Sequence, residues 1–256
     1  MKKFLYVHSL FSSSAGNATR IFNDAASILI DCGVSMKKLF QQGEFDLDAI
    51  FLTHGHSDHI SGAGIVARAT GATVYAHSET LSKCNSSSQG FFHGCEVREI
   101  RPAEKVSIKG LIVESHSTSH DIEGAMYYTV SDEKNDLRFG LITDTGRYLP
   151  EMGPVLNSCD ALILEANHDV EMLNAFPGYP EAHKARISGD HGHLSNEQTI
   201  GFIEEHINLA TKQWIALGHL SPRTNTPEKV LGSIQGAFTD YERFLLAPSE
   251  ELLVIK

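Results

Sequence analysis

The stretch THGHSDH, Thr53–His59, carries three histidines and one aspartate in seven residues, directly after the apolar run AIFL. In extended backbone, residues two apart point to the same side, so His54 and His56 are placed to bind one ion together. Asp58 and His59 lie beyond a turn and point elsewhere, so the loop is able to serve a second ion. The alternative is a polar strand-to-helix turn, but so many histidines in so few positions make a metal site the stronger interpretation.

The composition is typical of one globular domain. The 256 residues are 41% hydrophobic, which is enough to bury a full core. Acidic residues outnumber Lys and Arg by 32 to 21, and the net charge is −11. This balance argues against a broad basic surface for polyanions, so any contact with nucleic acid has to be local.

The chain is expected to be cytoplasmic, without a membrane segment. The N-terminus begins like a signal peptide, but its apolar run from Phe4 to Val7 is soon interrupted by a histidine and serines. No stretch approaches the roughly 18 apolar residues of a membrane span. The four cysteines form no CxxC pair, which favours reduced thiols over a disulfide scaffold or a structural zinc site: Cys32, Cys84, Cys95 and Cys159.

Alternating apolar runs predict two mixed sheets covered by helices, an α/β (α+β) class. Strands at KFLYV, TRIF, SILID and AIFLT precede the histidine cluster, and a helix at ISGAGIVARAT follows it. Strands return in the middle, with DEKND as a hairpin turn, and helices and strands alternate from Tyr148 onward. Ser195 and Gln198 predict a capping box at one late helix, and Thr226 is the predicted cap of the last helix.

Three further ligand-type residues follow predicted strands. His120 lies in STSHD, Asp144 in LITDTG and His219 in WIALGHLS. Strand ends that meet around one mouth are where sheet proteins assemble their sites. A carboxylate such as Asp144 suits a bridge between two cations about 3.5–4 Å apart, because its charge offsets their repulsion. Each residue alone is equally well a capped strand end, but together with the cluster they are predicted ligands.

The motifs LIDCG, THGHSDH, SHD, TDTG and GHLS, in this order, resemble the metallo-β-lactamase superfamily over almost the whole chain. The resemblance implies one domain over residues 1–256, a four-layer αββα sandwich with a dinuclear metal site at its edge. It implies that the first metal is held by His54, His56 and His120, the second by Asp58, His59 and His219, and that Asp144 bridges them. Asp31 in LIDCG would buttress the histidine loop. His116 is the alternative to His120 as the third ligand of the first metal. The His-Asp dipeptide that begins at residue 120 favours His120.

The segments SSSAGNAT, LEANHDVEML and GDHGHLSN resemble the YycJ/WalJ branch of the superfamily, bacterial metal-dependent DNA exonucleases. This implies a 5′-3′ exonuclease with two divalent ions per chain, Zn or Mn, acting on DNA rather than RNA through a hydroxide that bridges the ions. The residues given catalytic roles are Asp58, Asp144 and His193. His193 would protonate the leaving oxygen, or it is only a neighbour of the helix cap. Phe11 and His191 depart from the branch's pattern, away from the metal ligands.

Other interpretations remain open at this stage. A small-molecule thioester or phosphodiester hydrolase would use the same ligands with a closed pocket, and an inactive module would bind metal only. A nuclease should instead have a channel with a positive rim, for which Lys184, Arg186 and Arg223 are candidates. Arg147 and Arg223 lie close in sequence to ligands and are candidates to neutralise phosphates, but surface ion pairing is the simpler account of both. The sequence leaves open the metal's identity, DNA against RNA, the polarity of digestion and the oligomeric state. It also leaves open the role of His191, and whether His168 orients a ligand or lies in a plain loop.

Overall fold

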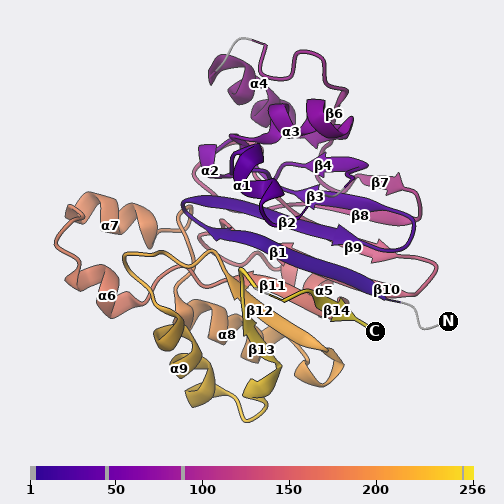
Figure 1. The fold of residues 1–256 in the computed structure, drawn as a ribbon. Helices are drawn as coiled ribbons and strands as arrows, with labels where there is room; N and C mark the ends of the chain where they lie inside the picture. The colour runs from indigo at the N-terminus through magenta and orange to yellow at the C-terminus, as the bar shows by residue number, and fades with distance from the viewer. Residues whose placement is uncertain (1–3, 44–45, 88–89, 250) are drawn as a thin grey trace. The chain divides into compact units, whose positions relative to one another are not determined.

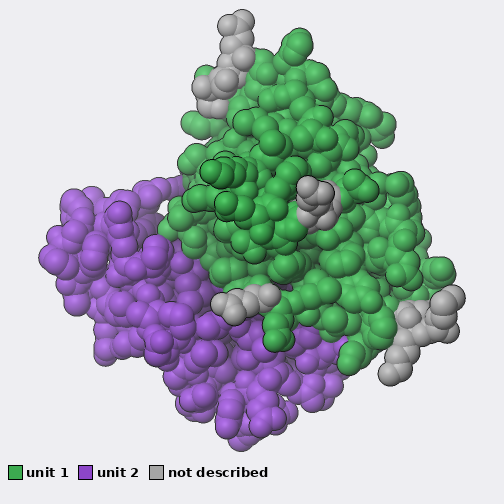
Figure 2. Space-filling view, in the orientation of Figure 1, with its two compact units in different colours: residues 1–117, 122–137, 248–256 green, residues 118–121, 138–247 purple. Residues whose placement is uncertain are grey.

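The computed structural model describes residues 4–43, 46–87, 90–249 and 251–256. Figure 1 shows the helices and strands along the chain. The chain divides into two compact units (Figure 2). Unit 1 combines residues 1–117, 122–137 and 248–256, and unit 2 combines residues 118–121 and 138–247. A single domain over the whole chain therefore stays a prediction.

Unit 1 contains a seven-stranded sheet in the order β14-β1-β2-β3-β4-β5-β6. Its strands are β1 (Leu5–Ser13), β2 (Gly16–Phe22), β3 (Ser27–Ile30), β4 (Ala49–Phe51), β5 (Thr73–Ala76), β6 (Val97–Glu99) and β14 (Leu253–Ile255). The strands from β3 to β6 are parallel, and the others pair antiparallel. Strand β4 is buried along its whole length, as expected for a parallel strand covered on both faces.

Four helices of unit 1 connect or precede the parallel strands: α1 (Met36–Phe40), α2 (Ser57–Ile60), α3 (Ala63–Thr70) and α4 (Ser78–Ser87). Val66 of α3 packs into one core cluster with Ile50 and Val74. An antiparallel meander completes unit 1, with β7 (Lys105–Ile108), β8 (Leu111–Ser117) and β9 (Met126–Asp132). Apolar side chains of α3 and of the parallel strands thus form one core layer in unit 1.

Unit 2 contains a parallel sheet in the order β10-β11-β12-β13. Its strands are β10 (Leu137–Ile142, all but the first residue in unit 2), β11 (Ala161–Glu165), β12 (Trp214–Gly218) and β13 (Phe244–Leu246). Its helices are α5 (Met152–Asn157), α6 (Val170–Ala175), α7 (Glu181–Ile187), α8 (Asn196–His206) and α9 (Pro227–Ala237), with short 3₁₀ turns at Leu209–Thr211 and Tyr241–Arg243. Strands β11 and β12 are buried throughout.

Local predictions are confirmed at the helix ends. The capping box of α8 is present, with the Ser195 side chain accepting from the Gln198 backbone and the Gln198 side chain accepting from the Ser195 backbone. Thr226 caps α9, whose first residue is Pro227.

Strand β13 was not predicted, because its run FLL is too short to carry a period. Within the described part of the chain no helix has the length and apolarity needed to cross a membrane.

Candidate metal centre

Three residues of the candidate site occupy sharp backbone turns just after parallel strands. Asp31 follows β3, Asp144 lies two residues after β10, and His219 follows β12. Their φ angles are 60°, 58° and 55°. This left-handed conformation is unfavourable for residues other than glycine, and it is concentrated at functional sites. The predicted strand-end residues therefore lie where the chain turns abruptly out of its sheet.

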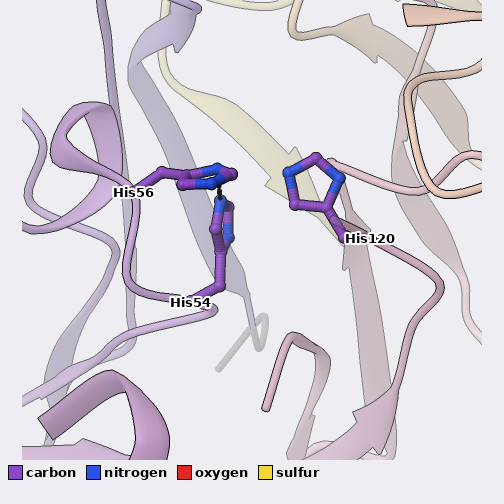
Figure 3. A group of neighbouring side chains, drawn as sticks. All are labelled: His54, His56 and His120. Atoms are coloured by element: carbon purple, nitrogen blue, oxygen red, sulfur yellow. Dashed lines mark hydrogen bonds between the residues drawn. The ribbon is translucent and has the colours of Figure 1, made fainter. Parts of the chain in front are cut away.

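The histidine loop of unit 1 connects β4 to α2, as the sequence predicts. His54 Nε2 lies 3.0 Å from His56 Nδ1, and their rings meet edge to face at 83°. Figure 3 shows this hydrogen bond and also draws His120. Two nitrogens on one tetrahedral zinc ion lie about 3.3 Å apart, so the pair has nearly the spacing of shared ligands. Asp58 and His59 form a second pair, with His59 Nε2 at 3.5 Å from Asp58 Oδ2.

Asp31 fixes the orientation of this loop. Its carboxylate, 2% exposed, accepts from the Thr53 backbone N–H at 2.8 Å and the Thr53 hydroxyl at 2.9 Å, and lies 2.7 Å from His59 Nδ1. A carboxylate at Nδ1 holds the imidazole in the tautomer that leaves Nε2 as a ligand atom. The buttressing role implied for Asp31 agrees with these contacts.

Glycine at position 33 lets the LIDCG segment touch α2. A Cβ atom at Gly33 would lie 1.6 Å from the carbonyl oxygen of Asp58. The neighbouring Cys32 backbone N–H donates to the carbonyl of His59 at 2.8 Å. From the SSSAGN loop, Asn17 Nδ2 lies 3.0 Å from His59 Nε2. The N-terminal loop is therefore a tight turn whose last residue contacts the candidate ligand.

Unit 2 gathers a second group of ligand-type side chains. Asp144, Glu165, His193 and His219 each offer one atom, and these atoms all lie within 4.8 Å of one another. Asp144 Oδ1 is 3.5 Å from His219 Nε2 and 3.7 Å from both His193 Nδ1 and His120 Nε2. His120 Nδ1 faces the carbonyl of Gly192 at 3.1 Å, which leaves Nε2 directed at Asp144.

Glu165 is the residue that the sequence interpretation missed. It is fully buried at the end of β11, and its Oε1 lies 2.7 Å from His193 Nδ1 and 3.2 Å from His219 Nδ1. Oε2 accepts from the Thr145 backbone at 2.9 Å. Burial raises the pKa of Glu165, but the charge of His193 and the hydrogen bonds from His193 and His219 lower it more, so the carboxylate stays ionised. The sequence signal that could have identified Glu165 is its position as the single charged residue at the end of the apolar run ALILE.

The donor set suits divalent cations. It combines imidazole nitrogens with carboxylate oxygens, the ligand types of Zn²⁺ and Mn²⁺ sites. Burial lowers the pKa of His120, which favours the neutral imidazole that a metal binds. The anionic side chains Asp144 and Glu165, both buried, supply the charge that offsets a bound cation. The residues therefore fit the metals that the sequence implies.

His116 is engaged elsewhere. It lies on β8, where its Nε2 is 3.1 Å from the Thr129 hydroxyl. Its ring stacks on that of Tyr127, its cross-strand partner, with ring centroids 4.7 Å apart. These contacts within the sheet favour His120 over His116 as a ligand.

The remaining polar residues of the LEANHD and GDHGH segments have separable roles. Asn167 Nδ2 donates to the carbonyl of His219 at 3.0 Å, so Asn167 orients that histidine's turn. Asp169 caps α6 by accepting from the backbone of Met172. His168 is buried, and burial lowers its pKa to about 4. His191 is exposed, with Nδ1 3.2 Å from the Ser119 hydroxyl.

The cations proposed from sequence for phosphate contacts are already engaged. Arg223 lies over the ring of Tyr179, 5.8 Å from its centroid. The other three pair with carboxylates: Lys184 with Glu181, Arg186 with Asp121, and Arg147 with Asp190. Surface ion pairing thus describes Arg147, and Lys184 and Arg186 do not form an uncompensated positive rim.

Comparisons of the sequence and of the fold relate the chain to known proteins. A family model described as "Beta-lactamase superfamily domain" matches residues 26–216. Exodeoxyribonuclease WalJ of Streptococcus pneumoniae is 35% identical over 86% of this chain and 82% of that protein. Exodeoxyribonuclease YycJ of Bacillus anthracis is 35% identical over 88% of this chain and 85% of that protein. The metallo-beta-lactamase fold protein YhfI from Bacillus subtilis, 17% identical, matches 99% of this chain and 100% of its own with a TM-score of 0.74.

These similarities confirm the predicted metallo-β-lactamase sandwich and the class of metal-dependent hydrolase. The family model covers most of the chain. The two relatives match 86% and 88% of the chain. The chain therefore belongs to the β-lactamase superfamily and, within it, to the family of the WalJ and YycJ exodeoxyribonucleases.

Proposed function

We propose that the protein is a metal-dependent 5′-3′ exonuclease that cleaves the phosphodiester bonds of DNA in the cytoplasm. The observation that carries this proposal is the 35% identity, over 86% and 88% of the chain, to two proteins named exodeoxyribonucleases. The four cysteines are free thiols, which is in keeping with a reducing compartment.

The proposal includes two divalent ions per chain, Zn or Mn, within one domain. The ligands of the first ion are His54, His56 and His120; those of the second are Asp58, His59 and His219; Asp144 bridges. The convergence of ligand-type atoms on Asp144 supports this assignment. Asp58 and Asp144 act in catalysis by holding the ions.

Bound ions of this kind supply a nucleophile near neutral pH and polarise the phosphoryl oxygens. The chain's own residues keep the ligands in place: Asp31 orients His59, and Glu165 orients His219. Glu165 also engages His193 at Nδ1, which leaves Nε2 as the atom that gives a proton to the leaving oxygen. The His193 side chain is 20% exposed, so a substrate has access to it.

The test is incubation of the metal-loaded protein with end-labelled single- and double-stranded DNA and RNA, alongside a nitrophenyl thioester. We expect DNA to be shortened from its 5′ end. Faster cleavage of RNA would make the protein a ribonuclease. Hydrolysis of the thioester without cleavage of any nucleic acid would replace the proposal with a small-molecule hydrolase, and labelled fragments from the chain interior would contradict the exonuclease mode.

A further inference from the structure

Unit 1 carries a groove beside the histidine loop that the ligand assignment leaves unused. One hollow of about 440 Å³ is lined by residues that include His56, Ile60, Lys83 and Phe91. A second hollow of about 220 Å³ is lined by residues that include Ile65, Arg68 and Phe91. Because Ser61 and Phe91 line both hollows, the two lie side by side between His56 and Arg68, and together we call them the loop groove. The volume of the larger hollow is in the range of ligand pockets, about 300–1,000 Å³.

The groove has an aromatic wall. Phe91 is partly exposed and lines both hollows. Its ring is held edge to face against Phe92, with centroids 4.8 Å apart, and Phe92 belongs to the core. Ile65, which is 51% exposed, extends the apolar surface. An anchored, accessible ring beside aliphatic groups has the properties of a platform on which a nucleic-acid base stacks.

Lys83 adds a positive charge close to the histidine loop. A Cβ atom on Gly55 would lie 3.0 Å from Lys83 Cβ and Cγ, so the stem of Lys83 packs directly on that loop. Among the described residues, none places a carboxylate oxygen within 4.0 Å of Lys83 Nζ. The lysine is exposed, so its ammonium is available to a ligand in the hollow.

Arg68 adds a second cation at the other end of the groove. Its Nη1 donates to the carbonyls of Phe91 and His93, both at 3.1 Å. These neutral acceptors fix the segment that carries Phe91, and no carboxylate of the described residues pairs with the Arg68 guanidinium. In a chain of net charge −11, two cations that flank an apolar groove are complementary to an anionic ligand with apolar faces.

We propose that the loop groove binds nucleotides of a single DNA strand, with one base stacked on Phe91 and backbone phosphates at Lys83 and Arg68. This inference rests on the proposed nuclease function and adds the strand's path and its strandedness. A base paired within a duplex is already stacked on its neighbours, so the groove selects an unpaired strand.

Binding measurements on the metal-loaded protein test the groove independently of turnover. The probe is a labelled thymidine phosphorothioate of about ten nucleotides, a usual site size for single-strand binders, followed by anisotropy at several salt concentrations. Phe91→Ala should weaken binding by about 5- to 100-fold without changing the salt dependence. The plot of log K against log salt has a negative slope. Lys83→Ala should make this slope less steep by about 0.7, the value for one phosphate contact on a single strand.

Matched variants keep the result interpretable. Phe91→Trp retains an aromatic platform and should bind like the wild type, which shows that the loss in Phe91→Ala is not unfolding; thermal melting of both variants checks this. Lys37→Ala and Tyr241→Ala remove an exposed cation and an exposed ring elsewhere and should leave binding unchanged. Unchanged binding of the single-stranded probe in both Phe91→Ala and Lys83→Ala would overturn the proposal. The proposal would also be overturned if these substitutions weakened the binding of duplex DNA as much as that of the single strand.

Cleavage assays separate this proposal from the proposed function. If the wild type binds the oligonucleotide but cleaves no DNA, the proposed nuclease function is wrong. The anisotropy measurements on the wild type and the groove variants then decide the groove proposal by themselves. If DNA is cleaved while the groove variants bind and cleave like the wild type, the groove proposal fails and the nuclease function stands. With both correct, Phe91→Ala should raise KM for DNA, whereas Lys37→Ala and Tyr241→Ala should leave both KM and kcat for DNA unchanged.

Discussion

At the scale of single residues, the pair formed by His193 and Glu165 is the most informative contact. His193 Nδ1 lies 2.7 Å from the buried carboxylate, in a group that also contains Asp144 and His219. The same geometry suits a proton donor oriented by Glu165 or a further metal ligand. Substitution distinguishes the two roles, because a ligand takes metal with it and a proton donor does not.

We predict that His193→Ala retains its metal and its fold but cleaves DNA about 10²–10⁴-fold more slowly, the usual contribution of general acid catalysis. Hydrolysis of bis(nitrophenyl) phosphate should suffer much less, because nitrophenolate leaves without being protonated. Rates on both substrates and elemental analysis of the variant are the measurements. Equal losses on both substrates would assign His193 to positioning or metal binding, and no loss on either would leave it a neighbour of the Ser195 cap.

His168 gives a prediction for the pH dependence of stability. Burial lowers its pKa from 6.5 to about 4, so between these values the unfolded chain binds a proton that the folded chain does not. Stability is therefore lost as pH falls from about 6.5 towards 4. At about 1.4 kcal/mol per pKa unit, this residue accounts for up to about 3 kcal/mol.

Urea unfolding of the wild type and of His168→Gln at pH 7 and at mildly acidic pH measures this effect. The free energy of unfolding of the wild type should fall more steeply than that of the variant. His206→Gln, which removes an exposed histidine, should follow the wild type. Parallel curves for His168→Gln and the wild type would show that His168 has an ordinary pKa in the folded protein.

At the scale of elements, the contact between the LIDCG segment and α2 positions the histidine loop. The contact depends on Gly33, where a Cβ atom would meet backbone rather than a movable side chain. The three nearest atoms are all backbone atoms of Asp58 and His59, so an added methyl group has no space without displacing α2, which carries both residues.

We predict that Gly33→Ala destabilises the protein by about 1–3 kcal/mol, the usual cost of overpacking, and weakens metal binding. Gly201→Ala is the matched control, because it lies inside α8 and a Cβ atom there meets nothing within 4 Å. That substitution should stabilise the helix by about 1 kcal/mol. Chemical unfolding and metal titration measure both effects; normal metal affinity in Gly33→Ala would show that α2 is not positioned by this contact.

At the scale of the whole molecule, the ligand set predicts two divalent ions per chain. Asp144→Ala should lose the second ion more readily than His193→Ala, because only the first substitution removes the bridging charge. Elemental analysis after dialysis against a weak chelator measures the metal content of each variant. One ion or none in the saturated wild type would contradict the dinuclear site, and equal contents in the two variants would count against Asp144 as the bridge.

Features that depend on neighbouring residues were predictable from the sequence alone. The position of Thr53–His59 between a buried strand and a helix was predictable, because the preceding apolar run and the following helical period are both local signals. The capping box of α8 was readable because its two partners are three residues apart. The order of the motifs was enough to predict the family and its fold.

Contacts between side chains far apart in the sequence depend on how the elements pack, and they were not predictable from local patterns. Glu165 contacts residues 28 and 54 positions away, so its central role follows from the pairing of β11 with its neighbours. The pairing of Arg186 with Asp121 and of Arg147 with Asp190, and the hollow that Phe91 lines together with His56, have the same origin. The physical reason is that local periods fix which face of an element is buried, whereas the partners across that face depend on the packing of the elements.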